Sequence, residues 1–226
     1  MEKIFENKWF LLIVIALTWG SSFILIKKSL LVFTPYEIGA FGMAVSGLIL
    51  AYIGFPALRK MNNKTLFWVA LTGFLGAAVL MCFSEATSEE SKLGYALLVV
   101  LATACYAVAG LIIKEKLQHV PPVQLSGAVF SVWMIPSLFI LFFSGFFSDF
   151  ETNPEIWEAL GYLSILTVVG TAIAMILYYK LIQNTSAVFA STVTYLLPLV
   201  AVNGDYWMVK NLASGMYLVD CLSCGE

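Results

Sequence analysis

Five stretches of this chain carry no charged side chain over about 20 residues each, namely residues 9–26, 38–58, 65–84, 93–113 and 159–179. An α-helix needs about 20 apolar residues to cross the roughly 30 Å of hydrocarbon in a bilayer. The stretches are continuous rather than alternating, and they are about twice as long as the strands of a membrane β-barrel. They therefore predict membrane-spanning α-helices.

Three further stretches are less regular. Residues 120–148 are uncharged but longer than one crossing and contain Pro136, so we expect one helix with a kink and an extended end. Residues 186–202 predict a seventh span, broken by Pro198, and residues 206–222 are an eighth candidate that Lys210 and Asp220 interrupt. The predicted fold class is an all-α integral membrane protein, a polytopic helical bundle of 7–8 transmembrane helices.

The composition argues against several classes of function. Apolar residues make up 61% of the chain and charged residues 12%, whereas a soluble domain is about half apolar and a quarter charged. A net charge of −2 and a single histidine give no basic face for nucleic acid. Cys221 and Cys224 have no second cysteine pair and no histidine nearby, so we expect no metal site. Because the sequence shows no nucleophile–base pair or phosphate loop, we expect neither an enzyme nor a cofactor.

Loop charges predict the orientation of the chain. Counted from a cytoplasmic N-terminus, the inner segments carry eight lysines and arginines and the outer ones three or four. Cytoplasmic loops are enriched in these residues, so we expect a cytoplasmic N-terminus and a multi-pass protein of the cell (inner) membrane. The first stretch lacks a cleavage site before charged sequence, and we expect it to be a retained anchor rather than a signal peptide.

The sequence also contains an internal duplication. Residues 16–27 align without a gap with residues 103–114, so that Trp19 matches Tyr106 and Lys27 matches Lys114. Chance is the alternative interpretation, because apolar helices resemble one another easily. Three predicted crossings separate the copies, so the second copy enters the membrane from the opposite side. Such inverted repeats are typical of secondary transporters, whose halves alternately expose a central site to each face.

Four segments, taken together, resemble a known family. They are residues 17–23 (Leu-Thr-Trp-Gly-Ser-Ser-Phe), 33–38 (Phe-Thr-Pro-Tyr-Glu-Ile), 73–81 (Gly-Phe-Leu-Gly-Ala-Ala-Val-Leu-Met) and 192–200 (Thr-Val-Thr-Tyr-Leu-Leu-Pro-Leu-Val). In this order, over residues 9–202, the chain resembles the EamA-type branch of the drug/metabolite transporter superfamily. The resemblance implies a ten-helix carrier of two inverted five-helix repeats, which moves small metabolites such as amino acids, often outward.

The chain is shorter than that pattern. We expect residues 1–91 to form an incomplete first repeat of three helices, and residues 92–226 a second repeat of four to five helices with a degenerate C-terminal end. The third predicted span begins like the family's third helix and ends like its fifth, joined near Gly73 and Gly76. Gly42 stands where members of the family usually carry an arginine early in their second helix.

The first candidate site lies in the middle of the first predicted span. A carrier site is expected near the bilayer midplane, where polar groups face a cavity. Trp19 would wall a substrate pocket while Ser21 and Ser22 bond the polar groups of the substrate, and Tyr106 is the repeat equivalent of Trp19. The alternative is that Gly20 and the serines permit close helix packing, with the hydroxyls bonded to their own helix.

A second cluster comprises Thr194, Tyr195 and Pro198, where proline frees the carbonyl of Thr194 for a substrate or for a neighbouring helix. A structural kink is the alternative. Lys27 and Lys114 close their helices on opposite faces and are interpreted as snorkelling anchors or as charged gates. The aromatic residues near helix ends are interpreted as an interfacial belt, namely Trp9, Trp68, Trp157, Tyr178 and Tyr179.

These observations favour a secondary carrier of small metabolites or drugs that works by alternating access. The alternative is a transport-inactive, truncated membrane protein that acts as an interaction partner or as half of a dimer. The expected partners are the lipid bilayer, a small-molecule substrate and a possible second copy of the chain, without nucleic acid.

Overall fold

The computed structural model describes residues 7–85, 92–146, 155–200 and 202, and every regular element within them is a helix. Among the residues that the structure describes, four helices are long and apolar enough to cross a membrane, namely Lys8–Ser29, Pro35–Lys60, Pro122–Phe143 and Ile156–Asn184. The predicted all-α polytopic membrane fold is confirmed. The eighth predicted span and the pair Cys221 and Cys224 lie outside the described residues.

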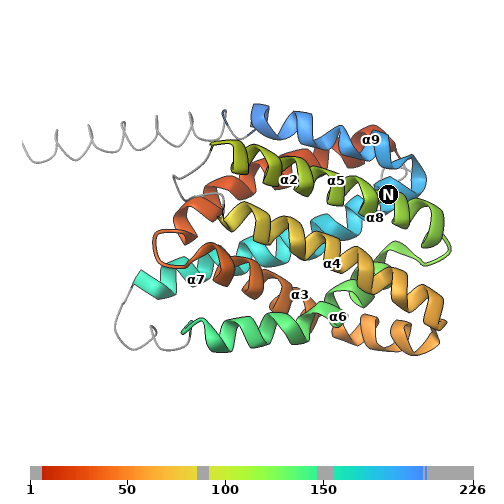
Figure 1. Ribbon diagram of the computed structural model, residues 1–226, viewed down its shortest axis with the longest axis horizontal. Coiled ribbons are helices and arrows are strands. Elements are labelled where there is room, and N and C mark those ends of the chain that lie inside the picture. Colours follow the sequence, from red (N-terminus) through yellow and green to blue (C-terminus); the bar gives the residue numbers. More distant parts are fainter. Residues whose placement is uncertain (1–6, 86–91, 147–154, 201, 203–226) are drawn as a thin grey trace, which may run out of the picture.

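The helices follow the predicted stretches closely. They are α2 (Lys8–Ser29), α3 (Pro35–Lys60), α4 (Asn63–Glu85), α5 (Lys92–Lys116), α6 (Pro122–Phe143), α7 (Glu155–Ile165), the π-helix η2 (Leu166–Ile173), α8 (Ala174–Asn184) and α9 (Ala187–Ser191). The segments α7, η2 and α8 follow one another without a break and form one long span. Figure 1 shows α2, α5 and α9 along one side of the bundle and α3 and α6 along the opposite side, with α4, α7 and α8 between them.

Local sequence explains where α3 begins. The Thr34 backbone N–H donates to Glu37 Oε2 at 2.8 Å, and the Glu37 backbone N–H donates to Thr34 Oγ1 at 3.4 Å. This reciprocal capping box satisfies donors that the first turn of a helix leaves unpaired. Pro35 follows at the first helical position, where its missing N–H costs nothing.

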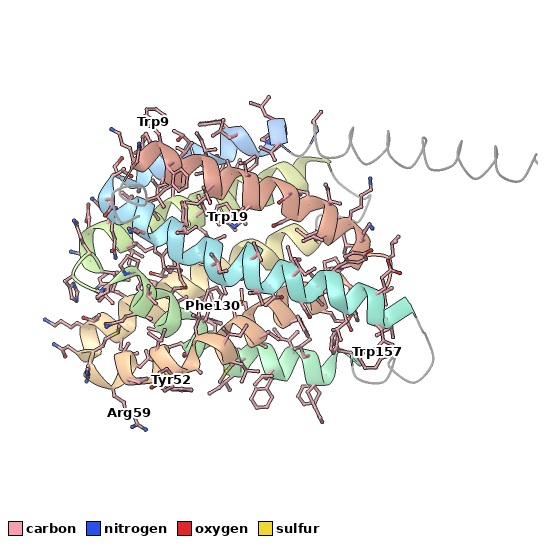
Figure 2. All side chains as sticks on the ribbon, turned by 180° about the vertical axis from the view of Figure 1, so that it is seen from behind. Trp9, Trp19, Tyr52, Arg59, Phe130 and Trp157 are labelled. Carbon is pink, nitrogen blue, oxygen red and sulfur yellow. The ribbon has the colours of Figure 1, made fainter. Side chains whose placement is uncertain are left out.

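Helices α3 and α6 pack closely on each other, and glycines make the close approach possible. A Cβ atom on Gly54 would lie 2.7 Å from the backbone carbon of Gly127, and one on Gly47 would lie 2.8 Å from the carbonyl oxygen of Phe130. Small residues at helix crossings let backbones pack closely in a bilayer, where no hydrophobic effect drives helices together. Figure 2 shows Phe130 inside this seam and Tyr52 and Arg59 on the outer side of α3.

Two prolines were expected to distort their helices. Pro136 lies inside α6, which runs unbroken from Pro122 to Phe143. The break expected at Pro198 is found six residues earlier, at Thr192, between α9 and a helical stretch that continues to Val200. At Thr192 the chain tightens, because its N–H bonds the carbonyl of Phe189, three residues back, at 3.1 Å.

The interfacial interpretation of Tyr178 and Tyr179 was wrong. Both side chains are buried, with exposed fractions of 4% and 3%. The reason is that the helix continues to Asn184, beyond the predicted end of the span at residue 179, so both tyrosines lie more than one turn inside it. Trp9 and Trp157 are exposed near helix ends, in agreement with an interfacial belt.

Candidate functional site

Three aromatic side chains from three helices meet around Tyr178. The ring of Trp19, on α2, lies 5.2 Å from the ring of Tyr178, on α8, and the ring of Tyr106, on α5, stacks on Tyr178 at 5.7 Å. Both distances lie in the range of favourable aromatic pairs. Trp19 lies about halfway along α2, on the side that faces the long Ile156–Asn184 helix (Figure 2). We call Trp19, Tyr106 and Tyr178 the aromatic cluster.

The aromatic cluster is joined to an unusual backbone segment. The Trp19 indole Nε1 donates a hydrogen bond of 2.9 Å to the carbonyl oxygen of Gly170, which lies in the π-helix η2. A π-helix bonds residue i to i+5 instead of i+4, is rare, and occurs frequently at functional sites. Close approach requires a glycine here, since a Cβ on Gly170 would lie 2.6 Å from Ser22 Oγ.

Hydroxyl groups border the same segment on the side of α3. Ser46 Oγ donates to the carbonyl of Thr167 at 3.4 Å, while Thr167 Oγ1 donates to the carbonyl of Leu163 at 2.8 Å. A Cβ on Gly42 would lie 3.8 Å from Thr171 Oγ1. The face of η2 that packs against α3 is therefore polar, although it lies within a candidate membrane span.

The two predicted serines use their hydroxyls within α2. Ser21 Oγ and Ser22 Oγ both donate to the carbonyl of Thr18, at 3.0 and 2.7 Å. Ser21 is exposed at the bundle surface, whereas Ser22 is buried against Gly170. Ser22 thus touches the π-helix through packing, as the alternative interpretation of this motif expected.

The second predicted cluster lies apart from the first. Thr194, Tyr195 and Pro198 are exposed at the bundle surface, and 77% of Tyr195 is accessible. Thr194 Oγ1 donates to the carbonyl of Ser191 at 2.7 Å, within its own helix. The structure does not bring these residues to Tyr178.

Lys27 and Lys114, interpreted from the sequence as anchors or gates, lie in different surroundings. Lys114 Nζ donates to the carbonyl of Gln183 at 2.7 Å and so joins the ends of α5 and α8. Lys27 is exposed, as expected for a snorkelling anchor, and the neighbouring Lys28 donates to the hydroxyl of Tyr162 at 3.0 Å.

Sequence reasoning missed Tyr178, Gly170 and Thr167. A signal was present, because Thr167, Gly170 and Thr171 recur at intervals of three and four residues and so share one face of a helix. No three His, Cys, Asp or Glu side chains of the described residues come close enough to hold a metal ion. The chemistry that the aromatic cluster and η2 offer is noncovalent: ring faces, hydroxyls and backbone carbonyls.

Comparison with protein families shows to which family the chain belongs. The model of the EamA-like transporter family matches it twice, over residues 7–92 and residues 93–211. The chain belongs to the EamA-like transporter family. The resemblance expected from the sequence is thereby confirmed. No curated protein and no solved structure matches the chain.

In this EamA-like protein the aromatic cluster is made of residues from both matched segments. Their boundary falls at residues 92 and 93, where α5 begins. Trp19 belongs to the first match, and Tyr106 and Tyr178 belong to the second. The aromatic cluster therefore joins the two family segments in the interior of the bundle.

Proposed function

We propose that this EamA-like protein is a secondary carrier of small metabolites, such as amino acids or drugs, and that it works by alternating access. One observation carries the proposal: Trp19 and Tyr106, which occupy equivalent positions in the aligned repeats, contact the same ring of Tyr178. Carriers with inverted repeats hold their substrate at the interface of the repeats near the midplane.

The packing of the helices supports two inverted halves, residues 1–91 and residues 92–226. The second helices of the halves, α3 and α6, pack on each other. The first helix of each half packs on the third helix of the other, since α2 contacts the α7–α8 span and α5 contacts α4. A pseudo-two-fold arrangement of this kind lets two equivalent conformations exist, one open to each side.

The aromatic cluster suggests how a substrate is bound. Ring faces of Trp19, Tyr106 and Tyr178 suit an apolar or planar part of a substrate, and the hydroxyls bordering η2 suit its polar part. The rings now contact one another, so we infer that a substrate enters when the halves separate on one side and Trp19 leaves Tyr178. Binding and release need no covalent step.

The orientation of the carrier follows from its loop charges. We place the N-terminus in the cytoplasm of a cell with the protein in its inner membrane, because lysines and arginines gather in the segments assigned to that side. A second copy of the chain is a candidate partner.

Transport in proteoliposomes tests the proposal. Purified protein is reconstituted, and uptake and efflux of a panel of labelled amino acids are measured for the wild type, Trp19→Ala and Tyr178→Leu. We expect transport of at least one compound, lost in both variants and kept in Tyr195→Ala, whose side chain is 77% exposed at the bundle surface. A flat response to a broad metabolite panel, from correctly inserted wild-type protein, would favour the transport-inactive alternative.

A further inference from the structure

One end of the seam between α2 and α7 is closed by a polar contact of three side chains. Lys28 Nζ lies 4.4 Å from the ring centre of Tyr162 and donates to its hydroxyl at 3.0 Å. The Tyr162 hydroxyl in turn donates to Glu158 Oε1 at 2.6 Å. A cation over an aromatic face and a hydrogen bond to a carboxylate are both strengthened by charge. We call Lys28, Tyr162 and Glu158 the clamp.

The opposite end of the Ile156–Asn184 helix, at α8, is held by hydrogen bonds to α5 and to the turn after it. Gln183, in the last turn of α8, donates through Nε2 to the carbonyls of Leu117 and Val120 at 3.2 and 2.9 Å. Lys114 Nζ donates back to the carbonyl of Gln183. Together with the stacking of Tyr106 on Tyr178, these bonds fix α8 to α5 and to the turn that follows α5.

A segment at which the helix can bend lies between the two ends of the Ile156–Asn184 span. The π-helix η2 lies between Tyr162 of the clamp and Tyr178 of the aromatic cluster. Sharp bends in helices occur at only a few kinds of position, and π-helical segments are one of them. Gly170, within η2, adds no side chain that would resist a change of the backbone angles there.

We propose, on the basis of the proposed carrier function, that the clamp is the gate at the outer end of the carrier and that it opens by bending of the Ile156–Asn184 helix at η2. Release of Tyr162 by Lys28 lets α7 move away from α2, while α8 stays fixed to α5. The movement uncovers Ser22 and Gly170 and opens a path toward the aromatic cluster.

The geometry favours this end over the other as the moving part. Between the halves, the inner end of α2 meets α9, where Lys8 Nζ lies 5.7 Å from the ring centre of Phe189 and Trp9 packs edge-on against the same ring at 5.4 Å. Those contacts lie on a different helix and do not require η2 to bend. The clamp, in contrast, joins Lys28 of α2 to Tyr162 and Glu158 of α7, which precedes η2 in the same span.

Distances between pairs of spin labels test the movement without requiring transport. In a chain whose four cysteines are replaced, one pair is placed at Leu31 and Gly161, and a second pair at Ile13 and Asn184. Leu31 is 83% exposed, and a Cβ on Gly161 meets nothing within 4 Å, so both positions accept a label. Ile13 and Asn184 are exposed on α2 and α8.

A graded series of clamp variants gives the expected result. Lys28→Met and Tyr162→Leu should lengthen and broaden the Leu31–Gly161 distance, Tyr162→Phe should do so less because it keeps the ring, and Lys28→Arg should resemble the wild type. The Ile13–Asn184 distance should stay unchanged throughout. Equal distances at the outer pair in all variants, or parallel changes at both pairs, would overturn the proposal.

Thiol labelling provides a second measurement. With Ser22→Cys in the same cysteine-free chain, an impermeant reagent added outside should react about tenfold faster in Lys28→Met than in Lys28→Arg, and in Lys116→Met it should react as slowly as in Lys28→Arg. Lys116 is an exposed lysine remote from the clamp in sequence and serves as the charge control. An unchanged rate in Lys28→Met would reject the gate. Because neither readout depends on a substrate, failure of the gate and failure of the proposed function remain distinguishable.

Discussion

Trp19 and Gly170 are 151 residues apart in sequence, and the indole Nε1 of the first donates to the carbonyl oxygen of the second at 2.9 Å. The bond joins the middle of α2 to the π-helix of the long span, and so joins the two segments that match the family model. In the hydrocarbon core of a bilayer the indole N–H needs such a partner, because no water is present to supply one.

Trp19→Phe tests the hydrogen bond separately from the ring. Phenylalanine keeps an aromatic face against Tyr178 but has no N–H for the Gly170 carbonyl, so we expect a loss of about 0.5–1.5 kcal/mol in the free energy of unfolding. Denaturation in detergent, followed by far-ultraviolet circular dichroism, measures the change. Trp19→Ala should lose more, because it also removes the ring contact. Equal stability of Trp19→Phe and wild type would show that the bond contributes nothing.

Tyr178→Phe and Tyr195→Phe form a matched pair for the position of the site. Tyr178 is buried between Trp19 and Tyr106, whereas Tyr195 is 77% exposed at the bundle surface. Once a transported substrate is known, we expect Tyr178→Phe to change its apparent affinity, and Tyr195→Phe to leave it within about twofold, as for surface substitutions in general. The reverse order of effects would place the site at the second predicted cluster instead.

Gly54→Ala should destabilise the bundle by about 1–3 kcal/mol, since its new methyl group would be forced against the backbone of Gly127. Thermal unfolding of the purified protein measures the loss. Gly161→Ala is the control, because a Cβ there meets open space and alanine favours a helix by up to about 1 kcal/mol over glycine. A tolerated Gly54→Ala would mean that α3 and α6 pack less closely than the structure shows.

Thr34→Ala should cost about 1 kcal/mol, because it removes the hydroxyl that accepts the Glu37 N–H at the start of α3. Thr34→Ser retains that hydroxyl and should stay near the wild-type stability. Chemical denaturation of both variants gives the comparison. If both lose the same amount, the methyl group of Thr34 rather than the capping bond is responsible.

Much of the fold could be predicted from the sequence. The helices α2, α3, α4 and α5 coincide with uncharged stretches to within about three residues at each end, because only a continuous apolar helix can fill the hydrocarbon thickness. Of the candidate site residues, Trp19 and Tyr106 were predicted through their equivalence in the repeat, and the structure brings both to the ring of Tyr178.

The contacts that could not be predicted depend on which face of each helix is turned toward the interior of the bundle. Spans that are apolar on all sides give no periodic signal for this, so Tyr178 and Tyr179 were interpreted as interfacial although both are buried in the bundle. The π-helix at Leu166–Ile173 was not visible either, since α- and π-turns use the same apolar residues.

The sequence by itself determined that this chain enters a membrane, where its helices lie and which family it belongs to, because hydrophobic length and repeat patterns are written along the chain. Only the tertiary structure decided that Trp19 bonds Gly170 and that Lys28 holds Tyr162. Those contacts depend on the rotation and depth of each helix, which close packing at residues such as Gly54 and Gly170 sets and which local composition does not.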